Sequence, residues 1–175
     1  GVIDCLKRGA NVVVAGRISD NALYVGPLMY EFGWDFKDPY WNRINAGVTA
    51  GHIIECAGCC SGNITNEWRK VVDHWRIGYP ICEFQENGDF VVTKIPGTGG
   101  VINEWTIKEH LVYEVHDPKA YLMPDGIADF TTLKVQELGK DRVQVTGCTG
   151  RPRPEKLKLS IAYEDGWLAE GIFMV

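Results

Sequence analysis

The sequence lacks the long apolar runs of a membrane protein and the basic excess of a nucleic-acid-binding protein. A transmembrane helix needs about 20 consecutive apolar residues, and no run in this chain approaches that length. The 18 Lys and Arg residues are outnumbered by 23 Asp and Glu residues, so the net charge is −5. This balance provides no electrostatic attraction for nucleic acid or for an anionic bilayer. We therefore expect neither as a partner.

Signals for secretion and for disulfide stabilisation are also missing. The chain begins without the basic segment, apolar core and cleavage site of a signal peptide. Six cysteines are too few and too scattered for a small disulfide scaffold. We expect an intracellular, soluble protein with reduced thiols, in the cytoplasm or the mitochondrial matrix. The absent initiator methionine, a helix-like start and a strand-like end predict that this is a fragment of a longer chain.

Three common catalytic fingerprints are absent as well. The chain has no G-x-x-x-x-G-K-[ST] phosphate loop, no G-x-G-x-x-G dinucleotide turn and no G-x-S-x-G nucleophile elbow. A kinase, a P-loop nucleotidase or a serine hydrolase therefore has no support. No motif implies a bound cofactor, and the sequence leaves any cofactor unknown.

What is present over the first two thirds is the pattern of an α/β domain. The run NVVVAG, residues 11–16, is typical of a strand buried on both faces of a parallel sheet. Residues 79–95 predict a β-hairpin around Asn87-Gly88, because Asn-Gly favours a tight turn. Helical patterns occupy residues 2–8, 19–32, 38–60 and 102–115.

The last third changes to alternating apolar and polar residues, which is typical of antiparallel strands with one solvated face. We predict an α/β fold with a partly parallel sheet and packed helices over residues 1–128. An antiparallel β-rich portion over residues 129–175 is expected to pack on the same domain. Its predicted strands are residues 130–138, 141–148, 156–164 and 167–175.

The glycine-rich turn Pro96-Gly97-Thr98-Gly99-Gly100 lies between the hairpin and the last helix. Its backbone N–H groups, from Thr98 to Gly100, suit an anion-binding nest at a helix start. The alternative is a strand-to-helix connection that needs positive φ at two positions. Spacing alone leaves both interpretations open, and we take Gly97, Thr98, Gly99 and Gly100 as candidate anion-binding residues.

The segment AGRISD provides a second candidate. Gly16 ends the expected parallel strand, and ligands in open α/β sheets gather at such strand ends. The guanidinium of Arg17 could bind a carboxylate or phosphate in a bidentate fork. Asp20 could orient Arg17 or take a catalytic role. The alternative is that Asp20 only caps the next helix and Arg17 is a surface charge.

The segment GHIIECAGCC, residues 51–60, combines imidazole, carboxylate and thiol groups. On a helix, its five candidate ligands fall within an arc of about 140°. Zinc uses such ligands, but the spacing of a zinc finger or ribbon is absent, so we predict no metal. We take His52 and Glu55 as candidate acid–base residues, with a satisfied buried histidine as the alternative for His52.

Two further segments carry charge near turns. Arg151 and Arg153 lie on one side of an extended loop spaced by prolines, which suits a phosphate or carboxylate ligand or an interface. Asp117-Pro118 and Pro124-Asp125-Gly126 are turn sequences, so turns explain most of the aspartates in residues 114–130.

Several of these segments together resemble one family. VVVAGRISDNALYVGPLMYEFGW, AGHIIECAG, TKIPGTGG, YEVHDPKAYLMPD and TGRPRPEKLKLSIAYEDGWLAEG resemble, in this order, the acyclic terpene utilisation protein AtuA family. The likeness covers essentially all 175 residues. After Ala57 the chain departs from the family pattern, with Cys59-Cys60-Ser61-Gly62-Asn63 in place of a Gln followed by Thr-Gly-Gly. Family members are longer, so the chain looks like an internal part.

The resemblance implies a role in the breakdown of acyclic terpenes, which proceeds through CoA thioesters. It favours a hydratase, lyase or isomerase that acts on an acyl-CoA or organic acid, in a homo-oligomer or larger assembly. A non-catalytic assembly subunit and a metal-dependent hydrolase are the alternatives. The family-like positions are Gly16, Arg17, Asp20, His52, Glu55, Cys56, Gly97, Thr98, Gly99, Gly100, His116, Asp117, Pro118, Arg151 and Arg153.

Overall fold

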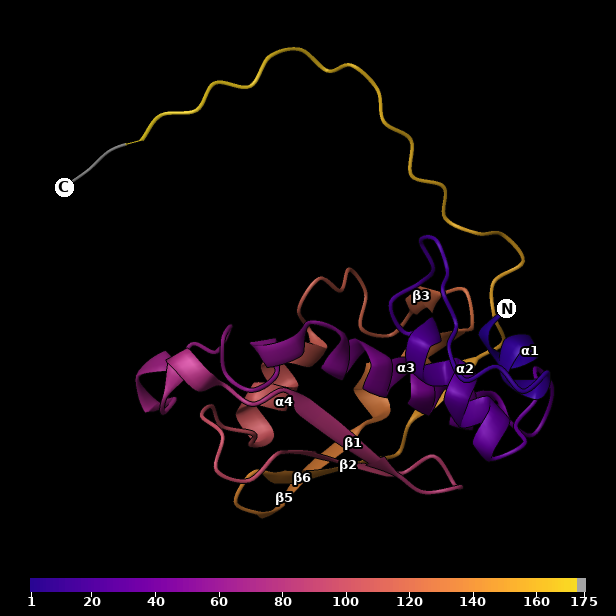
Figure 1. Cartoon of the computed structure of the whole chain (residues 1–175), viewed down its shortest axis with the longest axis horizontal. Coiled ribbons are helices and arrows are strands. Elements are labelled where there is room, and N and C mark those ends of the chain that lie inside the picture. Colours follow the sequence, from indigo (N-terminus) through magenta and orange to yellow (C-terminus); the bar gives the residue numbers. More distant parts are fainter. Residues whose placement is uncertain (173–175) are drawn as a thin grey trace.

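The computed structural model describes residues 1–172, in which helices pack against two antiparallel sheets (Figure 1). None of the helices among these residues is both long and apolar enough to cross a bilayer. The α-helices are α1 (Val2–Lys7), α2 (Ala22–Glu31), α3 (Trp41–Glu55) and α4 (Glu104–Leu111). The short 3₁₀ helices are η1 (Ala57–Cys59), η2 (Trp68–Lys70), η3 (His74–Arg76) and η4 (Phe130–Thr132). The strands are β1 (Pro80–Phe84), β2 (Phe90–Lys94), β3 (Tyr121–Met123), β4 (Gly126–Asp129), β5 (Lys134–Gly139), β6 (Arg142–Thr146) and β7 (Thr149–Arg151).

Helix α3 is the centre of the molecule, and every residue from Ile44 to Ile53 is buried. It contacts α2, α4, β1, β4 and β7, so both sheets meet it. Small residues allow this close packing: a Cβ added at Gly51 would lie 2.6 Å from Cβ of Asn21, which precedes α2. Apolar side chains of β2, β6 and α4 complete the core around α3.

The larger sheet has the strand order β1-β2-β6-β5, and the smaller one has the order β3-β4-β7. Every pairing between these strands is antiparallel. The prediction of mixed helices and strands is confirmed, whereas the prediction of a partly parallel sheet is wrong for the described residues. The only parallel contact among them is an isolated bridge between Ile77 and Gly99.

The predicted β-hairpin over residues 79–95 is confirmed. Strands β1 and β2 pair from Pro80 with Lys94 to Phe84 with Phe90. Gly88 has a φ of 95°, which a glycine adopts without the strain that a side chain would cause. The Asn-Gly signal therefore identified the turn correctly, because the conformation that it favours is a local one.

The predicted buried strand over residues 11–16 is wrong. These residues have no regular structure, and the side chains of Val12 and Val14 are 79% and 92% exposed. A run of valines makes a buried strand only where neighbouring strands supply hydrogen bonds on both sides. Within residues 1–172, no strand pairs with this segment.

The predicted strands over residues 156–164 and 167–175 are wrong as far as residue 172, and residues 173–175 lie outside the described part. The segment after β7 leaves the body of the molecule as an extended chain (Figure 1). Its apolar side chains are exposed, among them Leu157, Ile161 and Trp167. Alternation predicts an amphipathic strand, but a strand forms only with a partner. The predicted strand over residues 141–148 is confirmed in β6, and the one over residues 130–138 is confirmed only from Lys134, where β5 begins, because residues 130–132 form η4.

Candidate functional site

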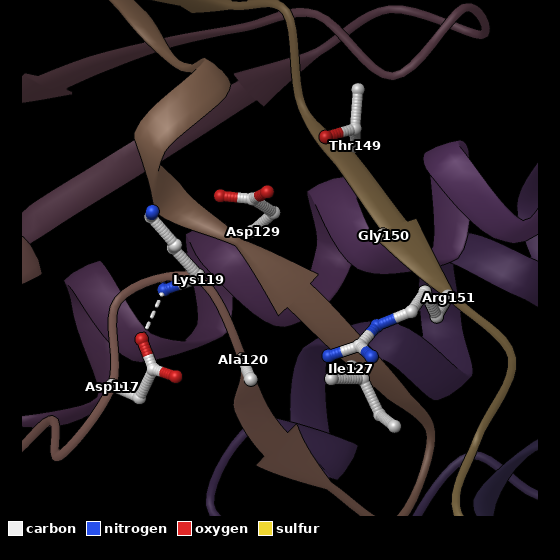
Figure 2. A pocket seen from close by; sticks show the side chains of 8 residues that line it. All are labelled: Asp117, Lys119, Ala120, Ile127, Asp129, Thr149, Gly150 and Arg151. Atoms are coloured by element: carbon white, nitrogen blue, oxygen red, sulfur yellow. Dashed lines mark hydrogen bonds between the residues drawn. The ribbon is translucent and has the colours of Figure 1, made fainter.

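The best candidate site is a pocket of about 370 Å³ beside the smaller sheet (Figure 2). Its walls are the turn before β3 and the two paired strands β4 and β7. Basic, acidic and hydroxyl side chains line it together with the apolar side chain of Ile127. The lining residues are Asp117, Lys119, Ala120, Ile127, Asp129, Thr149, Gly150 and Arg151.

Helix α3 fixes the wall that β7 forms. The side-chain amide of Asn45 donates hydrogen bonds to the carbonyl oxygens of Trp41, at 2.8 Å, and of Arg151, at 3.1 Å. The side chain of Asn42 accepts one from the N–H of Gly150, at 3.2 Å. A Cβ at Gly150 would overlap the side chain of Asn45, so only glycine lets the strand approach the helix this closely.

Two cations stand on opposite sides of the pocket. The side chain of Lys119 comes from the turn before β3, and that of Arg151 comes from β7 (Figure 2). Within residues 1–172, neither side chain has an ion pair or a hydrogen bond to a protein acceptor. Arg17 and Arg142, by contrast, are paired with Asp20 and Glu83. Lys119 and Arg151 are therefore available to an anionic ligand.

The two aspartates of the pocket are engaged by local hydrogen bonds. One oxygen of Asp117 accepts the N–H of Lys119 at 2.9 Å, which fixes the turn that carries Lys119. Asp129 accepts the hydroxyl of Thr131 at 2.6 Å and its N–H at 2.9 Å. The hydroxyl bond is the main cause that lowers the pKa of Asp129 below its ordinary value. Asp129 is therefore ionised at neutral pH and is a weak proton acceptor.

The structure places the predicted site residues in separate places. Arg151 lines the pocket. Arg153 does not, because its guanidinium stacks 4.8 Å from the ring centre of Phe36. Arg17 and Asp20 form an exposed ion pair with 3.0 Å between Nη1 and Oδ1. This is the geometry expected if Asp20 orients Arg17, but neither residue lines the pocket.

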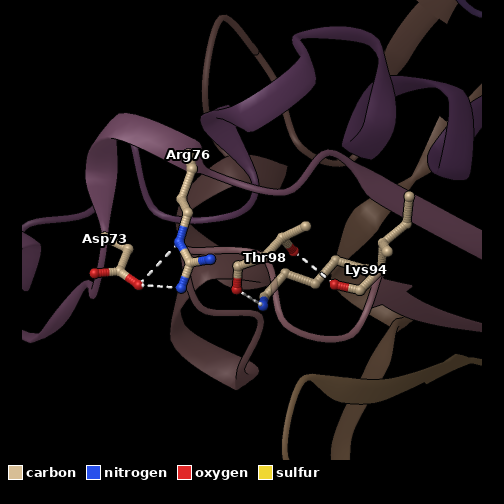
Figure 3. Close-up of polar contacts among 5 residues, drawn as sticks. Asp73, Arg76, Lys94 and Thr98 are labelled. Carbon is tan, nitrogen blue, oxygen red and sulfur yellow. Dashed lines mark hydrogen bonds and ion pairs between the residues drawn. The ribbon is translucent and has the colours of Figure 1, made fainter.

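The glycine turn is held by bonds within the protein (Figure 3). The N–H groups of Thr98, Gly99 and Gly100 donate to the carbonyl oxygens of Ile95, Arg76 and Val72, at 3.3, 3.0 and 2.7 Å. Gly97 and Gly100 have φ values of 81° and 82°. The turn therefore has the geometry of a strand-to-helix connection, and these three amides are occupied in this conformation.

A buried lysine ties the same turn to the larger sheet. Lys94, only 5% exposed, donates from Nζ to the carbonyl oxygen of Thr98 at 3.0 Å (Figure 3). Its Nζ also pairs with Asp141 at 3.2 Å. The other oxygen of Asp141 accepts the N–H of Ile102 at 3.0 Å. These contacts fix the turn at both ends.

His52 is buried and forms a reciprocal pair with His110 of α4. Nε2 of His52 lies 3.0 Å from the carbonyl oxygen of His110, and Nε2 of His110 lies 2.9 Å from that of His52. A carbonyl only accepts, so both Nε2 atoms carry the proton and donate. The ring of His52 also packs on Tyr121 and Phe130. The pair links α3 to α4, and His52 does not line the pocket.

Burial lowers the pKa of His52 from its ordinary 6.5 to about 4, and the neighbouring His110 adds to the shift. The unfolded chain therefore binds a proton more readily than the folded one, and stability is lost as the pH falls below 6.5 towards 4. We expect wild-type protein to lose about 3 kcal/mol more than His52→Gln between pH 7 and pH 4, measured by urea unfolding. Equal losses in the two proteins would contradict the lowered pKa.

The residues around the end of α3 do not form a metal site. Among residues 1–172, no group of three or more His, Cys, Asp or Glu side chains has the geometry to hold a metal ion. The thiol of Cys56 donates to Glu55 at 2.8 Å. Glu55 is exposed at the helix end and does not line the pocket.

Sequence reasoning missed Lys119 and Thr149 as site residues. The sequence feature that could have identified Lys119 is the Asp117-Pro118 turn. In such a turn the aspartate accepts the N–H of the residue two positions later, which fixes the position of Lys119. Thr149 carried no such signal, because its place depends on the pairing of β7 with β4 and on a 2.8 Å contact with the hydroxyl of Thr132.

The sequence model of one family, described as acyclic terpene utilisation family protein AtuA, matches residues 1–175. No curated protein and no solved structure shows significant similarity to the chain.

Proposed function

Because the chain belongs to the acyclic terpene utilisation family AtuA, we propose that it binds an organic acid or acyl-CoA thioester of acyclic terpene catabolism. The pocket beside β4 and β7 would receive the carboxylate or phosphate of that ligand. The observation that supports this proposal is the pair of unpaired cations, Lys119 and Arg151, on opposite sides of one pocket.

The chemistry of the pocket suits an anionic head group. An arginine fork binds the two oxygens of a carboxylate or phosphate, and a lysine adds a third charged donor. Thr149 and Ile127 line the same pocket. A polar group of the ligand could therefore contact the Thr149 hydroxyl, and a short apolar segment of the ligand could contact the Ile127 side chain. A pocket of about 370 Å³ lies near the lower end of the range for small-molecule sites. It suits a head group better than a whole CoA molecule.

Binding is better supported than a chemical step. A hydratase, lyase or isomerase needs a base near the reacting carbon. Of the two carboxylates in the pocket, Asp129 has a lowered pKa and bonds to Thr131, and Asp117 accepts the N–H of Lys119. The predicted catalytic residues Asp20, His52 and Glu55 do not line the pocket. An enzyme with a further base, or a ligand-binding subunit of an assembly, would both be consistent with this arrangement.

The proposal is tested by calorimetry with a branched-chain acyl-CoA, the corresponding free acid and inorganic phosphate as separate ligands. We expect Lys119→Ala and Arg151→Ala each to raise Kd by about tenfold, since a lost charged hydrogen bond is worth about 1.4 kcal/mol or more. Lys140→Ala is the matched control, because Lys140 is exposed in the turn between β5 and β6. Unchanged affinity in both pocket variants would contradict the proposed site. Comparison of the three ligands distinguishes a carboxylate site from a phosphate site.

A further inference from the structure

Two cysteines at the end of α3 are separated by only two residues. Helix α3 ends at Glu55, and the chain continues as Cys56-Ala57-Gly58-Cys59. Neither sulfur takes part in the proposed ligand pocket. Both cysteines are partly exposed, whereas the next residue, Cys60, is fully buried.

The turn between them brings the two side chains together. Ala57 has a φ of 51°, which reverses the chain directly after the helix, and the N–H of Cys59 donates to the carbonyl oxygen of Cys56 at 3.1 Å. A turn closed by such a bond holds the two Cα atoms within about 7 Å of each other. Disulfides span about 4.4–6.8 Å between Cα atoms, so this spacing fits one. Cys56 also acts on the Cys59 thiol as a side-chain hydrogen-bond partner.

The turn is fixed by its surroundings. Gly58, at its centre, is buried, and a Cβ there would lie 2.5 Å from the side chain of Ile77 and 2.9 Å from that of Asn63. The position of the Cys56 thiol is fixed by the 2.8 Å bond that it donates to Glu55. The two sulfurs are therefore presented by a defined backbone conformation.

We propose that Cys56 and Cys59 are a modification site, at which thiol–disulfide exchange with a small-molecule disulfide forms an intramolecular disulfide bond. One cysteine loses its proton to solvent, and its thiolate attacks a sulfur of oxidised glutathione. A mixed disulfide forms and one glutathione thiolate leaves. The second cysteine, deprotonated by solvent, then attacks the protein sulfur of that mixed disulfide and releases the second glutathione. Two protein thiols are oxidised and one glutathione disulfide is reduced to two thiols.

The charges around the two sulfurs determine how fast this occurs. The pKa of Cys56 is raised to about 12 by burial and by Glu55, with smaller effects of Cys59 and Glu114. The pKa of Cys59 is also raised, mainly by burial and then by Glu55. Within residues 1–172, no Lys, Arg or His is among the groups that act on these two thiols, so no cation stabilises a thiolate. The attacking thiolate is scarce at neutral pH, and the rate rises with pH.

Glu55 is a positioning residue that acts through the Cys56 thiol. Its carboxylate accepts a hydrogen bond from the S–H group and repels a developing thiolate, so it stabilises the reduced form. Replacement by glutamine keeps the size of the side chain and removes the charge. Oxidation of Glu55→Gln is therefore expected to be faster than oxidation of the wild-type protein.

The test is incubation of the whole chain with oxidised glutathione at pH 7, 8 and 9, followed by acid quenching, alkylation in denaturant and peptide mapping. We expect the free thiol count to fall from six to four, with one linkage joining Cys56 to Cys59. The initial rate should rise by about tenfold per pH unit, and reduction should restore all thiols. Cys59→Ser should instead keep glutathione on Cys56.

A second set of variants keeps the test decisive. Cys5→Ser and Cys148→Ser, which leave the turn intact, should form the same linkage as the wild-type protein. A Cys59–Cys60 linkage, stable mixed disulfides on both residues of the wild-type protein, or six unchanged thiols would each overturn the proposal. A slower reaction of Glu55→Gln would overturn the role given to Glu55.

Discussion

His52→Ala is expected to lower the free energy of unfolding by about 4 kcal/mol, within the range for removal of a buried aromatic ring. The substitution removes both the bond that His52 donates to the carbonyl oxygen of His110 and the contacts of its ring with Tyr121 and Phe130. The His110 carbonyl, in α4, still accepts the N–H of Tyr113 at 3.0 Å, so the loss comes from the removed bond and ring contacts and not from an unsatisfied polar group.

The measurement is urea unfolding at pH 7, where His52 is neutral. His116→Ala is the matched control, because His116 is exposed and forms no hydrogen bond through its side chain within residues 1–172. That variant should stay within about 0.5 kcal/mol of wild type. His52→Gln should lie between the two, since its amide retains a donor for the carbonyl. A loss below 1 kcal/mol for His52→Ala would contradict the structural role of the pair.

Lys94→Ala is expected to destabilise the protein by about 3–5 kcal/mol, because it leaves Asp141 without its charged partner. The side chains of Lys94 and Asp141 are only 3% and 17% exposed, so solvent does little to replace the lost contact. The substitution also removes the donor to the carbonyl oxygen of Thr98, and with it one tie between the glycine turn and β2.

A double variant separates the buried charge from the lost packing. Lys94→Met keeps most of the apolar stem, and Asp141→Asn keeps an acceptor for the N–H of Ile102 while tolerating the φ of 52° at that position. Lys94→Met alone should be nearly as unstable as Lys94→Ala, and the double variant should regain most of the loss. If the double variant is no more stable than Lys94→Met in urea unfolding, an unpaired Asp141 is not the cause.

Sequence reasoning predicted those elements whose conformation depends on neighbouring residues. The β1–β2 hairpin carries its own Asn-Gly turn, and α4 begins at Glu104, directly after Asn103, whose side chain accepts the N–H of Thr106. Each of these signals lies within a few residues of the feature that it specifies. The same is true of α2, which contains Pro27 in its first turns and stops before Gly33.

The elements that were mispredicted depend on distant partners. Residues 11–16 and 156–172 have the composition of strands, but a strand needs another strand, and composition does not say which one. Among the candidate site residues, the glycine turn depends on distant partners in the same way. Its amides bond to Val72 and Arg76, more than 20 residues earlier, and no spacing rule within the turn reveals those acceptors. Arg151 was identified because arginine in an extended loop is informative alone, whereas its partner Lys119 comes from another segment.

The most direct test of the proposed function is a crystal structure of the protein with a branched-chain carboxylic acid or its CoA thioester. We predict that the carboxylate or a phosphate lies within hydrogen-bond distance of both Lys119 Nζ and the Arg151 guanidinium, beside Thr149. A ligand bound at the Gly97–Gly100 turn or beside Arg17, with the Lys119 and Arg151 side chains free, would contradict the assignment of the pocket.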